Sequence, residues 1–299
     1  MKLSIIIPVF NEEENIEKIY SEIIKLFSFK YEIIFINDGS NDNTYNELEK
    51  LYKKDNKHIK VINFSRNFGK DAAIYAGLKY SCGEYNCIID GDMQQSPKYL
   101  IDMIKYLDEN KSCDSVAMCA NSRKNEFFLK SFFIKLFYMF INLVSDIKFK
   151  KDAGDFRMFR NNVKDAILNV KEKTRFSKGI FNSIGFNTYY MQYDIDKRYS
   201  GKTKFNILNS FKYALRGIIN YSNKPIIIGL IIGLILIIIG ILFEIINIEI
   251  SNNIILIFIG VIFLYLYIIG IYVYNLFIEV KDRPIYIIKS MLGIEDEKE

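Results

Sequence analysis

The sequence predicts an α/β fold, a mostly parallel sheet covered by helices, followed by two membrane-spanning helices. Over about the first 120 residues, short runs rich in Ile, Val and Phe alternate with amphipathic stretches. That alternation is typical of parallel sheets with helices on both faces. Pro225–Tyr274, in contrast, consists almost entirely of Ile, Leu, Phe, Gly and Tyr. Such a composition is expected of segments that lie in lipid.

Hydrophobic periodicity defines the elements of the N-terminal part. The expected strands are Lys2–Val9, Tyr31–Asn37, Lys60–Phe64, Tyr85–Asp90 and Ser115–Ala120. The expected helices are Glu13–Phe27, Thr44–Asp55, Lys70–Tyr80 and Pro97–Asp108. Asn11 and Glu14 have the spacing of a capping box, which predicts that the first helix opens there.

Two apolar runs, Pro225–Phe243 and Ile254–Tyr274, are each long enough to cross ~30 Å of hydrocarbon. The link Glu244–Asn253 lacks Lys and Arg. The flanks are basic, and the positive-inside rule therefore places both ends and the N-terminal domain in the cytoplasm. The alternative is a pair of buried helices in a soluble protein. The flanking cations are Lys212, Arg216, Lys224, Lys281, Arg283 and Lys289.

Two further amphipathic stretches precede the spans. Phe127–Ile147 contains Lys130 and Lys135, so we interpret it as helices on the membrane surface, with core helices as the alternative. Residues 205–224 are expected to form an interfacial helix that leads into the first span. The predicted organisation is therefore a cytoplasmic domain over 1–204, the interfacial helix, two spans within 225–274 and a cytoplasmic tail over 275–299.

Composition limits the function. The net charge is +5, and no long basic stripe interleaved with aromatics is present, which argues against nucleic-acid binding. The four cysteines and the single His58 have no metal-ligand spacing, so we expect reduced, buried thiols in a cytosolic domain. The composition is also compatible with a homo-oligomer.

Acidic and polar residues follow three of the expected strands, where ligands bind in open α/β sheets. Asp90 and Asp92, about 6–7 Å apart if the strand continues, could hold Mg²⁺ or Mn²⁺ with a diphosphate. A surface turn is the alternative. Asp38 could contact a base or ribose of a nucleotide. The alternative is that this segment only caps the following helix, through Ser40. Asn11-Glu12 could likewise contact a ribose or cap a helix.

Three more segments suggest phosphate or acceptor chemistry. Ser65–Lys70 places Gly69 and two cations at a helix N-terminus, which suits phosphate, although a solvated loop fits equally. Asp152–Arg157 contains a carboxylate that could orient or deprotonate an acceptor. The alternative is that an acid and an Arg of this segment form an ion pair within a loop. The basic loop Lys197–Lys204 suits a diphosphate or an anionic headgroup, with a purely electrostatic anchor as the alternative.

In this order, the motifs resemble family two glycosyltransferases of the polyprenyl-phosphate type, the group of dolichol-phosphate mannose synthase and the bactoprenol glucosyltransferases. The resemblance covers nearly the whole chain. Three positions depart from the common pattern: Asn37, Asp71 and Met93. The matching segments are Ile7–Glu12, Asn37–Ser40 with Asp42 and Thr44, Ser65–Lys70, Asp90–Gln94 with Pro97, Asp152–Arg157, Arg175 with Lys178-Gly179, Arg198–Lys204 and Glu279–Tyr286.

The resemblance implies a GT-A (Rossmann-like) fold, an inverting transfer, and a role for each matching residue. Asp155 would be the candidate base, and Asp92 would be the other catalytic residue. The nucleotide site would comprise Pro8, Asn11, Glu12, Asp38, Lys70 and Asp90. The metal, Mg²⁺ or Mn²⁺, would be held by Asp90, Asp92 and Gln94. Donor or lipid phosphates would be bound by Arg123, Arg157, Arg175, Lys178, Arg198, Lys202 and Lys204.

The predicted reaction moves a sugar from a nucleoside diphosphate, such as UDP-glucose, to undecaprenyl or another polyprenyl phosphate at the cell membrane. A GDP-mannose-dependent synthase is one alternative. A processive synthase fits less well because the chain has no Trp and so lacks the Gln-x-x-Arg-Trp motif of that class. A non-catalytic membrane scaffold that retains the fold is the alternative of another kind.

Overall fold

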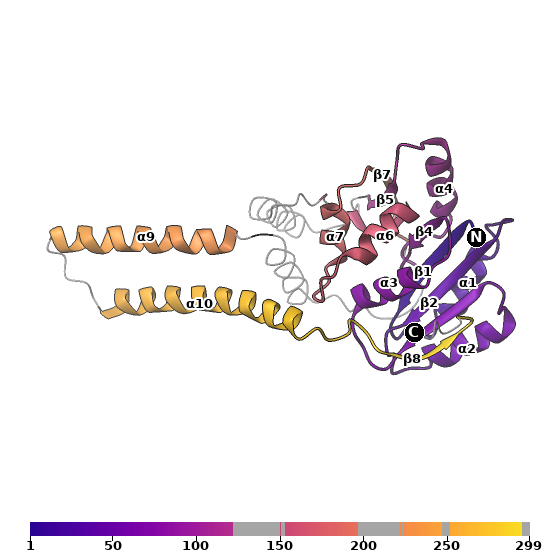
Figure 1. Ribbon diagram of the computed structural model, residues 1–299, viewed down its shortest axis with the longest axis horizontal. Coiled ribbons are helices and arrows are strands. Elements are labelled where there is room, and N and C mark those ends of the chain that lie inside the picture. The colour runs from indigo at the N-terminus through magenta and orange to yellow at the C-terminus, as the bar shows by residue number, and fades with distance from the viewer. Residues whose placement is uncertain (122–149, 151–152, 197–221, 223, 247–251, 295–299) are drawn as a thin grey trace. The chain divides into compact units, whose positions relative to one another are not determined.

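The computed structural model describes residues 1–121, 150, 153–196, 222, 224–246 and 252–294 (Figure 1). The described residues belong to two compact units. One contains the sheet, its helices and the C-terminal strand, and the other contains two long helices. The predicted interfacial stretches, 127–147 and most of 205–224, lie outside the described residues.

Within the described residues, eight strands form one mixed sheet of order β7-β5-β6-β4-β1-β2-β3-β8. The four strands β3-β2-β1-β4 are parallel, whereas β6 runs antiparallel to β4 and β5, and β8 antiparallel to β3. The first-unit strands are β1 (Leu3–Val9), β2 (Tyr31–Asn37), β3 (Ile59–Phe64), β4 (Tyr85–Ile88), β5 (Ser115–Ala120), β6 (Ala153–Arg160), β7 (Thr188–Tyr193) and β8 (Ile288–Leu292).

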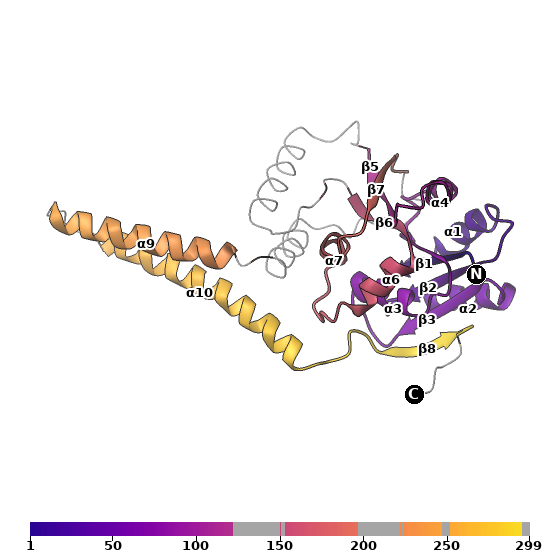
Figure 2. The same cartoon turned by 45° about the horizontal axis from the view of Figure 1, so that its top comes forward.

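Helices cover both faces of this sheet, which explains why its central strands are continuously apolar. Alternate residues of β1 such as Ile5 and Ile7 share a core with α1, α2 and α4. On the other face, Ile6 and Ile36 lie against Gly77 of α3, where a Cβ would lie 2.4 Å from Ile6, and α6 lies beside α3 (Figure 2). The helices are α1 (Ile16–Ile23), α2 (Thr44–Lys54), α3 (Lys70–Lys79), α4 (Tyr99–Glu109), α6 (Asn161–Asn169) and α7 (Ser177–Ser183).

Three local expectations were wrong. The capping box does not form, because α1 begins at Ile16 with Asn15 as its N-cap, and Asn11 instead adopts a φ of 52°. Strand β4 ends at Ile88, two residues before the expected end. Cys82 is exposed, whereas buried thiols were expected.

The second unit contains α9 (Lys224–Ile245) and α10 (Asn252–Val280). The Tyr265 hydroxyl of α10 donates to the Ile226 carbonyl of α9 at 2.9 Å, so the two helices are in contact. The segments Lys224–Phe243 and Phe258–Val280 are long and apolar enough to cross a membrane. They overlap the two predicted spans.

Candidate active site

The loops after β1 and β2 are hydrogen-bonded to each other at the carboxyl ends of the strands. The Asn11 amide donates to the Ser40 hydroxyl at 2.9 Å, and the Asn41 amide donates to Asn11 Oδ1 at 2.8 Å. The Glu12 amide donates to Thr44 Oγ1 at 2.9 Å. Neither Asn11 nor Ser40 caps a helix, since α1 and α2 begin at Ile16 and Thr44. These bonds bring the predicted nucleotide residues of both loops together.

Asp38 holds the segment Ser65–Lys70 in place. Its buried carboxylate accepts hydrogen bonds from the Phe68 amide at 2.7 Å and the Gly69 amide at 3.0 Å. Burial raises the pKa of Asp38 above its ordinary value, and these two backbone bonds only partly offset that effect. The carboxylate is thus occupied by the protein's own amides, and its contact with a nucleotide stays a prediction.

Asp90 and Asp92 lie in a tight turn rather than in a strand. The assumption that a continuous strand aligns the two carboxylates is therefore wrong, because β4 ends at Ile88. A different residue, Gln95, fixes the first acid: Asp90 N donates to Gln95 Oε1, and Gln95 Nε2 donates to Asp90 Oδ2, both at 2.9 Å. Asp92 Oδ1 accepts from the Gln94 amide at 3.1 Å.

Gly91 brings this turn against β1, next to Pro8. A Cβ at Gly91 would lie 2.7 Å from Val9 Cγ1 and 3.5 Å from the Pro8 carbonyl oxygen. The absence of a side chain at Gly91 therefore permits the close approach of the two segments.

Lys70 joins the acid of this turn to the acid of β6. Its ammonium lies 2.6 Å from Asp90 Oδ1 and 2.9 Å from Asp155 Oδ2. The antiparallel pairing of β6 with β4, in which Arg157 lies opposite Ile88, explains how residues so distant in sequence converge. Lys70, predicted to bind nucleotide, is here the shared cation of two carboxylates.

The electrostatics of the three groups differ. Burial opposes ionisation of Asp155, but Lys70 and Lys178 outweigh it and lower its pKa to about 2. Burial raises the pKa of Asp90, with Asp155 and Asp92 adding to the rise and Lys70 opposing it. Partial desolvation of the Lys70 ammonium, whose side chain is 41% exposed, works against its charge, but the two carboxylates outweigh it and raise its pKa above the ordinary value. Asp155 is thus ionised at neutral pH.

Three predicted phosphate-binding cations have defined places in the structure. Arg157 is buried, lies 3.7 Å from the Phe181 ring centre and donates to the Gly154 carbonyl at 3.0 Å. Burial lowers its pKa to about 10. Arg175 is buried and donates to the Val170 and Ile167 carbonyls at 2.8 and 3.1 Å.

Those bonds bind Arg175 to the end of α6, whereas Lys178, half-buried on α7, acts electrostatically on Asp155. The binding of phosphate by these three cations stays a prediction. Arg123, Arg198, Lys202 and Lys204 lie outside the described residues.

Asp71 is a site residue that the sequence did not single out as functional. It follows Lys70, and its Oδ1 accepts from the Ser177 amide at 3.0 Å, at the first residue of α7. The bond therefore ties the helix that carries Lys178 to the helix that carries Lys70. The only signal was the departure from the family's usual Glu at this position. Nothing in the pair Gln94-Gln95 indicated that Gln95 would hold Asp90.

The carboxylates suit a divalent cation. Asp90 and Asp92 offer hard oxygen ligands, and Asp155 Oδ1 is buried without a hydrogen-bond partner. In the part of the chain that the structure describes, no group of three His, Cys, Asp or Glu residues could hold a metal ion by itself. A metal here would need further oxygen ligands, such as those of a diphosphate.

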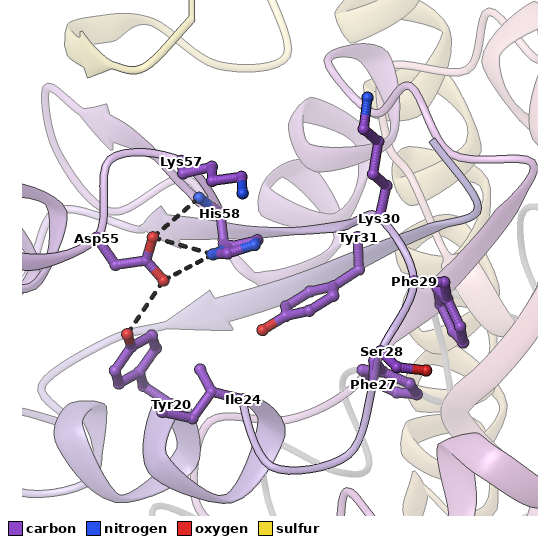
Figure 3. Close-up of a pocket in the computed structure, with 10 residues that line it drawn as sticks. All are labelled: Tyr20, Ile24, Phe27, Ser28, Phe29, Lys30, Tyr31, Asp55, Lys57 and His58. Atoms are coloured by element: carbon purple, nitrogen blue, oxygen red, sulfur yellow. Dashed lines mark hydrogen bonds and ion pairs between the residues drawn. The ribbon is translucent and has the colours of Figure 1, made fainter.

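A separate hollow of about 400 Å³ lies at the amino ends of β2 and β3, whereas the candidate site lies at the carboxyl ends of the strands (Figure 3). Asp55 accepts hydrogen bonds there from Tyr20 at 3.1 Å and pairs with His58 Nδ1 at 2.9 Å. The His58 ring stacks on Tyr31 with 4.8 Å between ring centres. These mutual contacts explain the arrangement of the lining without any ligand.

Comparison with known proteins identifies the family. Residues 4–168 match the family model described as Glycosyl transferase family 2. This chain belongs to glycosyltransferase family 2. The glycosyltransferase is 32% identical over 311 residues to an uncharacterised glycosyltransferase of Synechocystis sp., with 99% of this chain and 97% of that protein covered. It is 34% identical over 307 residues to the SfII prophage-derived bactoprenol glucosyl transferase of Shigella flexneri, with 97% and 98% covered.

The predicted GT-A fold is confirmed for this glycosyltransferase. Its sheet contains the order β3-β2-β1-β4-β6-β5 with β6 antiparallel, and family membership agrees with that topology. A solved structure of S. aureus TarS with UDP-GlcNAc has a TM-score of 0.49 and 18% identity, covering 75% of this chain and 70% of that one.

Proposed function

We propose that this glycosyltransferase transfers a sugar, with inversion, from a UDP-sugar such as UDP-glucose to a polyprenyl phosphate such as undecaprenyl phosphate. The main support for this proposal is similarity to a bactoprenol glucosyl transferase, which extends over nearly the full length of both chains. Two apolar helices in the second unit suit an acceptor that resides in the bilayer. The catalytic domain, predicted over 1–204, and both termini would face the cytoplasm.

The donor would lie over the carboxyl ends of β1, β2 and β4. Asn11, Glu12 and the loop after β2 would contact the nucleoside. Asp90 and Asp92, with Gln94 as a further predicted ligand, would hold Mg²⁺ or Mn²⁺. When bound, the metal would neutralise the charge that builds on the leaving nucleoside diphosphate.

An oxygen of the lipid phosphate would attack the anomeric carbon as the bond from that carbon to the nucleoside diphosphate breaks. A phosphate monoester is mostly dianionic at neutral pH, because its second pKa is about 6. The nucleophile therefore needs no strong base. Asp155, already ionised and held by Lys70, would position the acceptor, while Lys178 and the basic loop at 197–204 would offset the phosphate charge.

A donor panel tests the proposal. Purified protein with Mn²⁺ and undecaprenyl phosphate would receive radiolabelled UDP-glucose, UDP-N-acetylhexosamine or GDP-mannose, and the lipid extract would be counted. We expect label in the lipid from a UDP-sugar. Label from GDP-mannose alone would favour a mannose synthase, and no lipid-linked label from any donor, with no nucleotide binding, would favour a scaffold.

A further inference from the structure

A chain of side-chain hydrogen bonds links the C-terminal strand β8 to the loop after β1. It begins at Ser290, whose hydroxyl accepts from Asn63 Nδ2 at 3.2 Å and lies 3.1 Å from the Tyr45 hydroxyl. Asn63 Oδ1 accepts from Asn37 Nδ2 at 2.9 Å. We call this set the tail network, and it comprises Ser290, Tyr45, Asn63, Asn37, Ser40 and Asn11.

The network continues into the predicted nucleotide loops. Asn37 Oδ1 accepts from both the hydroxyl and the amide of Ser40, and the Ser40 hydroxyl accepts from the Asn11 amide. Asn11 has a φ of 52°, a conformation uncommon outside glycine that Asn adopts more readily than most residues. The hydrogen bond to the Ser40 hydroxyl fixes the Asn11 amide in this conformation, so the shape of the β1 loop depends on where Ser40 is held.

Burial fixes which group donates and which accepts at each hydrogen bond of the tail network. Asn37 and Asn63 are 2% and 6% exposed, so neither amide can replace a lost partner with bulk water. Asn37 Oδ1 accepts hydrogen bonds from Ser40, so the Nδ2 of Asn37 must be the donor to Asn63 Oδ1. The Nδ2 of Asn63 is then left to donate to the Ser290 hydroxyl. An unpaired buried amide is unfavourable, so removal of the Ser290 hydroxyl would favour rearrangement of the hydrogen bonds along the tail network.

The position of Ser290 is set by the segment that follows α10. Ser290 lies opposite Asn63 in the antiparallel pairing of β8 with β3. Just before β8, Tyr286 stacks on Phe64 with 5.0 Å between ring centres, and the Ser65 amide donates to the Ile287 carbonyl at 3.0 Å. The strand is therefore anchored before Ser290 by these contacts and after it by the pairing of Leu292 with Val61.

We propose that Ser290 is a positioning residue for the donor nucleotide, acting through Asn63, Asn37 and Ser40 on the loop that contains Asn11. The inference rests on the proposed nucleotide site. It assigns to the tail that follows the apolar helices a part in shaping that site, although Ser290 itself does not touch the donor.

Calorimetric titration of UDP with Mn²⁺ into the full-length protein in detergent tests the inference. Ser290→Ala should weaken binding about 5- to 10-fold, whereas Ser290→Thr, which keeps the hydroxyl, should bind within about twofold of wild type. Lys289→Ala is the matched control, because the neighbouring Lys289 side chain is exposed. In turnover assays, Ser290→Ala should raise KM for the donor with little change in kcat.

A double-mutant cycle guards against a general loss of structure. Ser40→Ala should weaken binding by itself, and adding Ser290→Ala to it should cost little more, because both changes interrupt the same chain. Full additivity, or wild-type binding by Ser290→Ala, would contradict the inference and leave the proposed function intact. An absence of UDP binding by the wild type would contradict the proposed function and the inference with it.

Discussion

Lys70 balances two carboxylates, one in the turn after β4 and one in β6. Its ammonium contacts Asp90 and Asp155 at 2.6 and 2.9 Å, and the pKa of Asp155 falls to about 2. A carboxylate with so low a pKa is a weak base at neutral pH. Asp155 therefore suits a role in holding Lys70 in place better than a role in accepting a proton.

Asp155→Asn should lower kcat by about 100-fold, the cost of a misplaced acceptor, and leave UDP affinity within a few-fold of wild type. The reason is that the amide keeps the size of the side chain but removes the charge that balances Lys70. Steady-state kinetics and calorimetry measure the two effects. Asp165→Asn, an exposed acid on α6, is the control. Unchanged kcat in Asp155→Asn would contradict this role.

The ion pair of Asp155 with Lys70 predicts that the stability of the fold depends on pH. The folded pKa of Asp155, about 2, lies below the ordinary value of 3.8. Its stabilisation of about 2 kcal/mol is therefore fully present above about pH 4 and disappears as the pH falls through about 2. Urea unfolding of wild type and Asp155→Asn should show a constant difference from about pH 7 to about pH 5 that shrinks below about pH 4. A difference that grows on acidification would contradict the assignment.

The site depends on close backbone packing between the loop after β2 and the loop before α3. Gly39, after β2, has a φ of 65°, and a Cβ on it would lie 2.2 Å from the Arg66 carbonyl carbon. Together with the bonds from the Phe68 and Gly69 amides to Asp38, this close contact sets the distance between the β2 loop and the start of α3, which carries Lys70.

Gly39→Ala should therefore destabilise the fold by about 3 kcal/mol or more and impair UDP binding. Gly185→Ala is a matched control, since Gly185 has a φ of 74° but nothing within 4 Å of the added Cβ. That change should cost only about 1–2 kcal/mol, the price of the left-handed conformation. Equal effects of the two substitutions on urea unfolding would show that the contact with Arg66 is unimportant.

The parallel strands could be predicted because burial on both faces gives continuous apolar runs such as Leu3–Val9. The acids after β1, β2 and β4 could be located by the same logic. The role of Lys70 could not, because it depends on the pairing of β6 with β4, which brings Asp155 to Asp90. Strand β8 was missed because its apolar residues follow the spans and pair with a strand more than 200 residues earlier.

The whole molecule combines a GT-A fold with two helices long and apolar enough to span a bilayer. The sheet unit includes residues from both sides of the apolar helices, because β8 follows α10. The chain therefore leaves the sheet unit before the two apolar helices and returns to it after them.

The full-length protein should behave as an integral membrane protein. Two apolar segments of ~20 residues each hold a chain in the bilayer against alkaline carbonate, which removes surface-bound proteins. Membranes from expressing cells, washed with carbonate and centrifuged, should retain the protein in the pellet until detergent is added. Release by carbonate alone would indicate that α9 and α10 do not span the bilayer.

The assignment of the Asp90–Asp92 turn is tested most directly by the transfer of labelled glucose from UDP-glucose to undecaprenyl phosphate, measured with membranes that contain wild-type protein or the Asp92→Asn variant. We expect a lipid-linked product that requires Mn²⁺ or Mg²⁺ and falls at least about 100-fold in the variant. Equal transfer by the variant, or wild-type transfer that persists unchanged in EDTA, would contradict the assignment of this turn as the metal–diphosphate site.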